Sequence, residues 1–362
     1  MTALRVLVVD DSAFNRRTLS AMLDSMPGVV VAGKATDGDE ALRLVEELSP
    51  DLITLDLEMP RMDGFTFLRL LMARRPTPVI VVSGYSAKEN VFRALELGAL
   101  DFVAKPTRTI TADLASIRDE LAEKVDLVRH LTPAGRDPLR RGSLPRGRTA
   151  TQAFALHRPE DDAPRAPRAA DTEPRKVVVV GASTGGPTAL LELFTQFPRS
   201  ASAALLVAQH MPERFTRTFA ERLDRLGALE VGEASGMHRL GAGHGWVCPG
   251  GRCLELNDTD DGLTVRVCAA EKDDRYVPSV DRLFESAAAA CGDRVIAVVL
   301  TGMGDDGARG VMAVKQAGGV VLAEAPESAI IYGMPGAAAR TGCVDQSLPL
   351  KDLAVHLARL VR

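Results

Sequence analysis

Residues 176–187, Lys-Val-Val-Val-Val-Gly-Ala-Ser-Thr-Gly-Gly-Pro, constrain the fold of this chain more than any other stretch. The β-branched run Val177–Val180 is too short for a helix and predicts a central strand, buried on both faces of a parallel sheet. The segment that follows it fits the G-x-S-x-G pattern of a sharp strand-to-helix turn, with Ser183 at its tip. Pro187 suits the first turn of a helix, so backbone N–H groups are expected beside Ser183.

Taken alone, this pattern has two other interpretations. It fits a tight crossover without chemistry, and it fits a glycine-rich loop that binds phosphate. The phosphate interpretation lacks a Gly-Lys-Ser/Thr sequence, and the next predicted strand, 204–208, ends in Gln209-His210 instead of the acid of a dinucleotide fold. The phosphate interpretation therefore leaves His210, which follows the second predicted strand, without a role.

The length of 362 residues favours two domains. No run of 18 apolar residues occurs, and Asp10-Asp11 interrupt the first apolar stretch, so we expect a soluble, cytoplasmic protein without membrane insertion or a signal peptide.

The five cysteines form no C-x-x-C pair, which argues against a disulfide framework. A zinc site at His244, Cys248 and Cys253 would need a second paired cluster. The net charge of −4 gives no basic excess for binding nucleic acid.

Strands and helices alternate over residues 4–105, which predicts a doubly wound parallel sheet. Ser12 is expected to cap the first helix, whose apolar stripe is Leu19, Met22, Leu23 and Met26. A second helix is expected over 38–48. The predicted strands are 4–9, 29–32, 51–56, 78–83 and 101–105.

Polar residues stand at the ends of four of these strands: Asp10, Asp11, Asp56, Ser83 and Lys105. Because the carboxyl ends of parallel strands meet at one edge, these side chains should converge there. Three clustered carboxylates need a cation, and Mg2+ suits oxygen ligands. One carboxylate could then accept a phosphoryl group, with Lys105 stabilising the added charge and Ser83 donating to a phosphoryl oxygen.

Four motifs of this half resemble the receiver domain of two-component response regulators: Asp10-Asp11, residues 55–64, Ser83-Gly84 and Lys105-Pro106. The resemblance covers about residues 1–125 and implies a flavodoxin-like fold. It implies Asp56 as the phospho-acceptor. It also implies Mg2+ at Asp10, Asp11, Asp56 and the carbonyl of Glu58, and a switch formed by Ser83, Phe102 and Lys105.

A linker is expected over residues 126–175. It should begin as a helix and continue as a disordered or extended tether, because 133–175 holds seven prolines and nine arginines. The remaining domain, 176–362, again alternates, with strands near 177–180, 204–208 and 295–300. Residues 232–267, rich in glycine around Trp246, are expected to form an inserted β-hairpin region, and 352–361 a closing helix.

Three strand-end loops of this second domain would present Ser183, His210 and either Asp305 or Asp306 at one edge. A serine nucleophile needs a base within hydrogen-bond reach, and the base needs an acid that fixes its tautomer. The arrangement indicates nucleophilic acyl transfer. Spacing alone does not choose between the two aspartates.

The motifs 181–186, 209–212, 278–281 and 300–307 resemble the catalytic domain of chemotaxis protein-glutamate methylesterases, a Rossmann-like α/β hydrolase domain. The resemblance implies Ser183 as nucleophile, His210 as base and Asp306 as orienting acid. Backbone N–H groups of Thr184 and Met303 would form the oxyanion hole, and no cofactor is implied there. Val277 stands where that family usually has an arginine, and Arg275 lies two residues earlier.

With the receiver in front, the resemblance implies a phosphorylation-activated hydrolase. It would demethylate glutamyl γ-methyl esters on the cytoplasmic helices of methyl-accepting chemoreceptors, release methanol, and deamidate specific receptor glutamines. The phosphoryl donor would be a chemotaxis histidine kinase, and the chain is expected to be a monomer. The resemblance also implies that the unphosphorylated receiver covers the active site.

Overall fold

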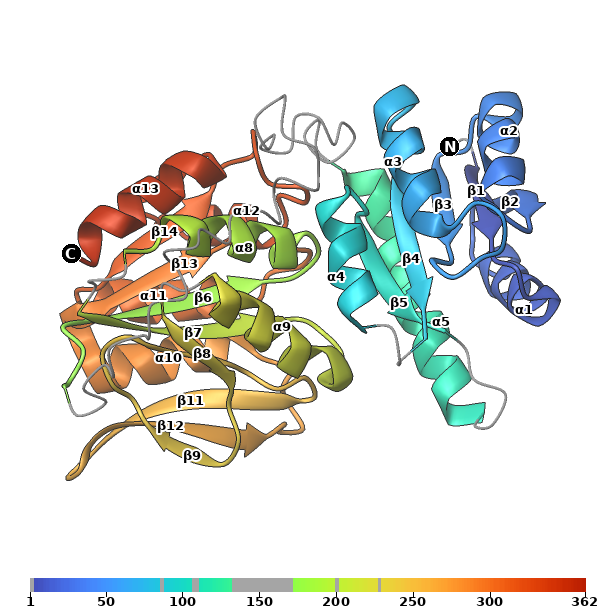
Figure 1. Ribbon diagram of the computed structural model, residues 1–362. Helices are drawn as coiled ribbons and strands as arrows, with labels where there is room; N and C mark the ends of the chain where they lie inside the picture. Colours follow the sequence, from blue (N-terminus) through green and yellow to red (C-terminus); the bar gives the residue numbers. More distant parts are fainter. Residues whose placement is uncertain (1–2, 85–87, 106–110, 132–171, 199–201, 227–228) are drawn as a thin grey trace. The chain divides into compact units, whose positions relative to one another are not determined.

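Figure 1 shows the computed structural model of the chain, which describes residues 3–84, 88–105, 111–131, 172–198, 202–226 and 229–362. The chain divides into two compact units, Met1–Arg141 and Gly142–Arg362. No helix among the described residues is long and apolar enough to cross a membrane. The proline- and arginine-rich part of the expected linker lies outside the described residues, and the domain boundaries at 125 and 175 stay predictions.

The first unit contains a five-stranded parallel sheet with the order β2-β1-β3-β4-β5. This is the flavodoxin-like order, whose switch point lies between β1 and β3. All five predicted strands are confirmed to within three residues at either end. Their bounds are β1 Leu4–Val9, β2 Val29–Ala35, β3 Leu52–Leu55, β4 Val79–Ser83 and β5 Asp101–Ala104.

Helices alternate with these strands, and short polar side chains cap the first three of them. The Ser12 hydroxyl accepts the Asn15 N–H, which confirms the predicted cap, and Leu19 and Leu23 are buried. Asp37 and Asp63 cap the next two helices in the same way. The helices are α1 Ala13–Asp24, α2 Gly38–Leu48, α3 Gly64–Arg74, α4 Lys88–Glu96 and α5 Thr111–Leu127, followed by the 3-10 turn η1 Val128–His130.

The second unit is built on a seven-stranded sheet in which every neighbouring pair is parallel, with the order β15-β14-β13-β6-β7-β10-β8. The predicted strand of valines is β6, and it lies between β13 and β7 with Val177–Val180 fully buried, as expected. The bounds are β6 Lys176–Ala182, β7 Ala203–Gln209, β8 Glu230–Glu233, β10 His244–Val247, β13 Val295–Val299, β14 Val320–Glu324 and β15 Gln346–Leu348.

The inserted region around Trp246 differs in part from the expectation. Trp246 lies in β10, which joins the parallel sheet together with β8 and is not part of a hairpin. The antiparallel piece is a separate three-stranded sheet of β9 Met237–Arg239, β11 Arg252–Thr259 and β12 Gly262–Ala269. Each of β8 and β10 has four residues and contains a glycine, so the glycine-rich composition obscured two short strands.

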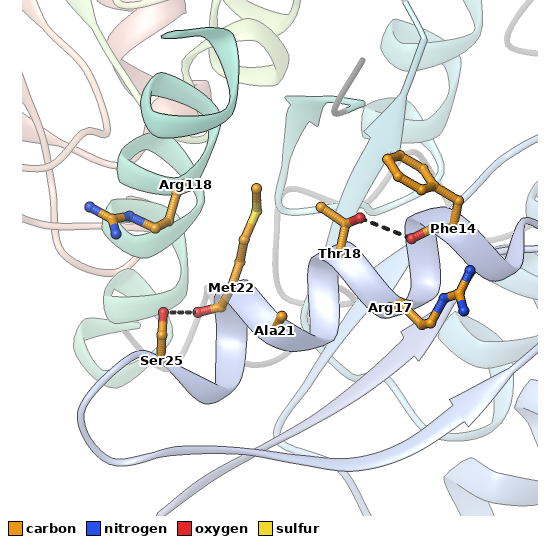
Figure 2. A pocket seen from close by; sticks show the side chains of 7 residues that line it. All are labelled: Phe14, Arg17, Thr18, Ala21, Met22, Ser25 and Arg118. Atoms are coloured by element: carbon orange, nitrogen blue, oxygen red, sulfur yellow. Dashed lines mark hydrogen bonds between the residues drawn. The ribbon is translucent and has the colours of Figure 1, made fainter. Parts of the chain in front are cut away.

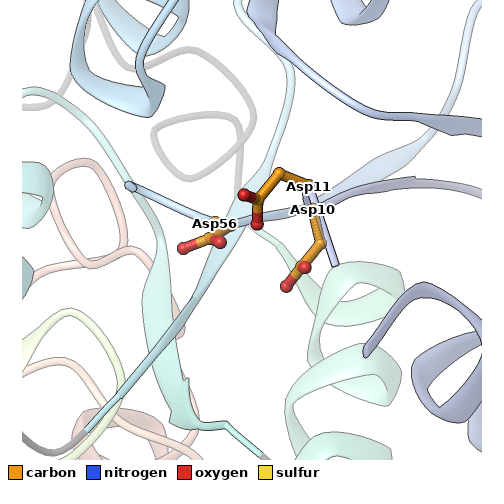
Figure 3. A group of neighbouring side chains, drawn as sticks. All are labelled: Asp10, Asp11 and Asp56. Carbon is orange, nitrogen blue, oxygen red and sulfur yellow. The ribbon is translucent and has the colours of Figure 1, made fainter. Parts of the chain in front are cut away.

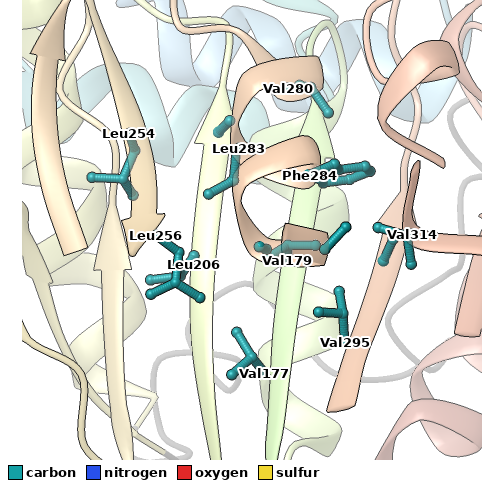
Figure 4. Close-up of a cluster of buried hydrophobic side chains, with 14 of the residues drawn as sticks. Val177, Val179, Leu206, Leu254, Leu256, Val280, Leu283, Phe284, Val295 and Val314 are labelled. Carbon is teal, nitrogen blue, oxygen red and sulfur yellow. The ribbon is translucent and has the colours of Figure 1, made fainter. Parts of the chain in front are cut away.

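Helix α10 connects the sheet of the second unit to this hairpin sheet. Figure 4 shows Leu283 and Phe284 of α10 in one apolar cluster with Val177 and Val179 of β6 and with Leu254 of β11. Gly310 of α11 lets the next helix approach, because a Cβ there would lie 2.5 Å from the Cβ of Phe284. The helices are α8 Gly186–Gln196, α9 Glu213–Arg225, α10 Val280–Cys291, α11 Ala308–Gln316, α12 Met334–Arg340 and α13 Leu350–Leu360, with the 3-10 turn η4 Gly292–Arg294.

Candidate functional site

The predicted acidic cluster forms at the carboxyl edge of the first sheet (Figure 3). Asp10 follows β1 and Asp56 follows β3, and these strands are neighbours. Carboxylate oxygens of Asp10, Asp11 and Asp56 all lie within 4.8 Å of one another. The Lys105 ammonium reaches the same place, 2.5 Å from Asp56 Oδ2 and 3.7 Å from Asp10 Oδ2.

The electrostatics of this cluster favour a bound cation. Burial is the main cause that raises the pKa of the Asp56 carboxyl; Lys105 opposes it, the charge of Asp10 adds to it, and the net pKa is about 6. Burial also raises the pKa of Asp10. The Glu58 N–H donates to Asp56 Oδ1 at 3.1 Å, so the backbone of Glu58 lies beside the carboxylates. Buried, crowded oxygens with excess negative charge fit Mg2+, which would hold both carboxylates in the charged form.

Two of the predicted switch residues, Ser83 and Phe102, lie on the neighbouring strands β4 and β5, and Lys105 follows β5. The hydroxyl of Ser83 donates to the Gly84 carbonyl at 3.4 Å, and Ser83 is buried. Phe102 is also buried and packs edge-to-face on Phe92 of α4, with ring centroids 6.4 Å apart. Phe102 therefore points into the unit, and a change in its position on phosphorylation stays a prediction.

Figure 2 shows a hollow along α1, lined also by Arg118 of α5. None of the residues predicted for a site lines it. Its lining residues are Phe14, Arg17, Thr18, Ala21, Met22, Ser25 and Arg118.

In the second unit, the predicted triad residues follow three neighbouring strands. Ser183 follows β6, His210 follows β7 and Asp306 lies in the loop after β13. His210 Nε2 and Asp306 Oδ2 are 2.8 Å apart, and the His210 N–H donates to the Ala182 carbonyl at the end of β6. Asp305 points elsewhere: it is exposed and accepts from Tyr276 and Arg275. The structure therefore brings Asp306, and not Asp305, to the histidine.

The first turn of α10 fixes the Asp306 carboxylate. Asp306 Oδ2 accepts the Val280 N–H at 2.8 Å and Oδ1 accepts the Asp281 N–H at 2.9 Å. The N-terminus of a helix favours negative charge, so a 98% buried aspartate has suitable partners there. This explains the motif 278–281, whose structural role the sequence did not reveal.

The bond to Asp306 decides which ring nitrogen of His210 could face Ser183. With His210 Nε2 bonded to Asp306, Nδ1 is the ring nitrogen left for Ser183. Among the described residues, no hydrogen bond joins Ser183 Oγ to His210. Such bonds are often long in the absence of substrate and tighten in the Michaelis complex.

The loop after β13 lies directly against the serine. A Cβ on Gly302 would be 2.7 Å from the Cβ of Ser183, so only glycine allows this approach, and the Ser183 N–H donates to the Thr301 carbonyl. The Thr301 hydroxyl donates to the Thr184 carbonyl and accepts the Ile331 N–H, each at 3.0 Å. Thr301 thereby joins the two backbone segments that carry the predicted oxyanion donors, Thr184 and Met303. Sequence analysis missed it.

A buried acid, Glu324 at the end of β14, supports Thr301 from behind. Its carboxylate accepts the Thr301 N–H at 2.8 Å and the Ser328 hydroxyl at 2.9 Å. Burial raises the pKa of Glu324 to about 7; the two hydrogen bonds oppose this, and the charge of Glu192 adds to it. The only signal in the sequence was an acid at the end of the apolar run 320–323.

Glu324 should make the stability of the second unit fall as the pH rises. The pKa of Glu324 is about 7 in the folded state and about 4.5 in the unfolded state, so the folded state binds the proton more tightly than the unfolded state does. The resulting contribution to the free energy of unfolding is complete below about pH 4.5 and is lost as the pH rises to about 7. The shift corresponds to roughly 3 kcal/mol. Glu324→Gln should remove this loss.

The sole tryptophan, Trp246, lies in β10 of the second unit, so its fluorescence during urea unfolding at pH 5 to 8 reports on the relevant transition. Glu327→Gln changes an exposed acid three residues after Glu324, in the turn after β14, and is the matched control. An unchanged pH dependence in Glu324→Gln would contradict the assignment.

Family comparisons agree with both halves of the structure. A model described as response regulator receiver domain matches residues 6–114, and one described as CheB methylesterase matches residues 178–357. Among solved structures, the second unit is similar to the Thermotoga maritima CheB methylesterase catalytic domain, with 36% identity and a TM-score of 0.50. That match covers 51% of this chain and 98% of the solved one.

Curated relatives match almost the whole chain. A protein of Anaeromyxobacter dehalogenans named protein-glutamate methylesterase/protein-glutamine glutaminase 6 is 50% identical over 99% of this chain and 96% of its own. A protein of Geobacter sulfurreducens with the same name and the number 3 is 48% identical over 98% and 96%. These matches span both units, and they agree with the acidic cluster of the first sheet and with the place of Ser183, His210 and Asp306 at one edge of the second. The chain therefore belongs to the protein-glutamate methylesterase/protein-glutamine glutaminase family, in which a receiver domain precedes a CheB methylesterase domain.

Proposed function

We propose that this chain is a phosphorylation-activated serine hydrolase that converts glutamyl γ-methyl esters of chemoreceptors into glutamate and methanol. The same site would deamidate specific receptor glutamines and release ammonia. The names of full-length relatives support the two activities. The observation that carries the proposal is the 2.8 Å bond between His210 and Asp306, at the sheet edge where Ser183 lies.

The first half of the reaction forms an acyl-enzyme. Ser183 Oγ attacks the γ-carbonyl carbon, and His210 takes the hydroxyl proton. The tetrahedral oxyanion accepts from the N–H groups of Thr184 and Met303. The C–O bond to the methoxy group then breaks, and His210 returns the proton to the leaving oxygen, so methanol departs.

The second half repeats these roles with water. His210 deprotonates a water molecule that attacks the acyl carbon, and the Ser183–carbonyl bond breaks as the proton returns to Ser183 Oγ. A glutamine substrate differs only in its leaving group, ammonia. This scheme uses no metal or cofactor in the second unit. Each oxyanion donor contributes roughly 3 to 4 kcal/mol in comparable enzymes.

The nucleophile and the base give the direct test. Ser183→Ala and His210→Ala should each lower kcat for methanol release from methylated chemoreceptor fragments by roughly a million-fold, because the two groups act as a unit. Trp246 fluorescence should show unchanged unfolding in both variants. Methanol release by Ser183→Ala at the wild-type rate would exclude serine catalysis, and no release by the wild type would favour a non-catalytic output domain.

The adjacent aspartates are distinguished by their partners. We expect Asp306→Asn to lower kcat by roughly 10,000-fold, because an amide would favour the wrong imidazole tautomer. Asp305→Asn is the matched control at the next residue and should stay within about threefold of wild type, as expected of an exposed side chain away from the reacting atoms. If the order of activities were reversed, Asp305 would be the orienting acid.

For the first unit we propose that Asp56 accepts a phosphoryl group from a chemotaxis histidine kinase. Mg2+ held by Asp10, Asp11, Asp56 and the Glu58 carbonyl would neutralise the added charge. Lys105, already 2.5 Å from Asp56, would stay paired with the phosphoryl group, and Ser83 would donate to it. We further propose that the unphosphorylated receiver inhibits the esterase, and that the chain acts in the cytoplasm as a monomer.

Regulation predicts a response to a small phosphoryl donor. Acetyl phosphate with Mg2+ should raise esterase activity of the full chain roughly 5- to 150-fold, the usual range of a coupling of about 1 to 3 kcal/mol. Asp56→Asn should stay at basal activity with or without the donor. Chelation of Mg2+ should abolish activation and leave basal activity unchanged, which separates the receiver from the esterase. Activation of Asp56→Asn by the donor would contradict the acceptor assignment.

A further inference from the structure

A tyrosine covers one face of the candidate catalytic histidine. The rings of His210 and Tyr276 are nearly parallel, 7° apart, with centroids separated by 5.3 Å. This is an offset stack, within the range that favourable ring pairs adopt. The imidazole edge remains open to its polar partners, so the contact restrains the plane of the ring without competing for either ring nitrogen.

Tyr276 is itself held at its far end. Its hydroxyl donates to Asp305 Oδ1 at 3.0 Å, and Arg275 Nη1 lies 3.1 Å from the same oxygen. Arg275 also lies over the Tyr276 ring, with Cζ 5.1 Å from the centroid. Burial and the Asp305 carboxylate raise the pKa of the Tyr276 phenol, so the hydroxyl stays a donor at neutral pH.

The backbone opposite the tyrosine leaves room for it. Gly304 has a φ of +86°, which glycine adopts without strain, and a Cβ there would lie 2.3 Å from the Tyr276 hydroxyl oxygen. Gly304 is adjacent to both Met303 and Asp305. The tyrosine thus packs on the same loop that carries a predicted oxyanion donor and the acid bound to His210.

An ion-pair cluster fixes the segment that carries Tyr276. Asp274 Oδ2 accepts the Glu271 N–H and a guanidinium N–H of Arg282, each at 2.7 Å. Arg282, in α10, also pairs with Glu255 of β11. The side chains of Arg282 and Asp274 are 14% and 11% exposed, so solvent screens this cluster little. The segment directly before Tyr276 is therefore tied to α10, the helix whose first turn holds Asp306.

We propose that Tyr276 is a positioning residue for His210: its ring holds the imidazole in the plane in which one nitrogen meets Asp306 and the other faces Ser183. The inference rests on the proposed hydrolase function. When the histidine takes the serine proton it becomes a cation, and the face of the tyrosine ring stabilises a cation. The ring therefore favours the charged state that forms during both halves of the reaction.

Two substitutions separate the ring from the hydroxyl. Tyr276→Ala removes the stack and should lower kcat by about 10- to 100-fold, with KM nearly unchanged, because the base is misplaced while substrate contacts remain. Tyr276→Phe keeps the stack and loses the bond to Asp305, so it should stay within about threefold of wild type. Trp246 fluorescence should show the same unfolding midpoint for both variants.

A second readout does not depend on the proposed substrate. A fluorophosphonate labels Ser183 in the full chain by a reaction that needs the same base, His210. Tyr276→Ala should therefore slow this labelling by about 10- to 100-fold, as it does kcat, and Tyr276→Phe should leave the labelling rate unchanged. Labelling of Ser183→Ala equal to that of wild type would refute the proposed function itself. Labelling that depends on Ser183 but proceeds at the wild-type rate in Tyr276→Ala would refute only the role of Tyr276. A raised KM with unchanged kcat would also refute it, and would make Tyr276 part of the substrate surface.

Discussion

The carboxylate of Asp306 links the packed core of the second unit to His210, because it bonds both to the first turn of α10 and to the imidazole. It is almost fully buried and accepts three hydrogen bonds, from His210 and from the N–H groups of Val280 and Asp281. A buried charge is tolerated only when such partners are in place. Because two of them belong to the first turn of α10, the direction in which the aspartate holds the imidazole depends on where α10 packs. That position follows from an apolar cluster, in which Leu283 and Phe284 lie against β6 and the hairpin sheet.

The two units place different chemistry at the same edge of similar sheets. In the receiver, Asp10 and Asp56 follow neighbouring strands, and burial, with a smaller contribution from the charge of Asp10, raises the pKa of Asp56 to about 6. Such a site needs a cation to hold negative charge. In the hydrolase unit a single buried aspartate is stabilised by a helix N-terminus and by an imidazole, so its charge is balanced without an ion. Strand order thus determines where a site forms, and the local charge balance determines what it can bind.

Much of this could be read from the sequence, for identifiable reasons. Four consecutive valines predict β6, and the rule that parallel strands end at one edge predicts that Ser183 and His210 lie at the same edge, as the pairing of β6 with β7 places them. Spacing could not choose between Asp305 and Asp306, because the choice depends on which side chain meets the first turn of α10, 25 and 26 residues earlier in the sequence. Glu324 and Tyr276 were missed for the same reason. Neither lies in a motif with a chemical pattern, and both act through residues distant in the chain.

The residues found only in the structure share a property that bears on rate. Thr301 and Glu324 lie behind Ser183 and fix the loop after β13. Holding donors in place before the reaction avoids reorganisation as charge develops on the substrate oxygen and on His210. Glycine provides the complementary condition, because Gly302 and Gly304 let the same loop approach Ser183 and Tyr276 more closely than any side chain would permit. The loop is therefore positioned from one side by buried polar bonds and from the other by the absence of a Cβ, so a shift in either would move Met303 and Asp306 together.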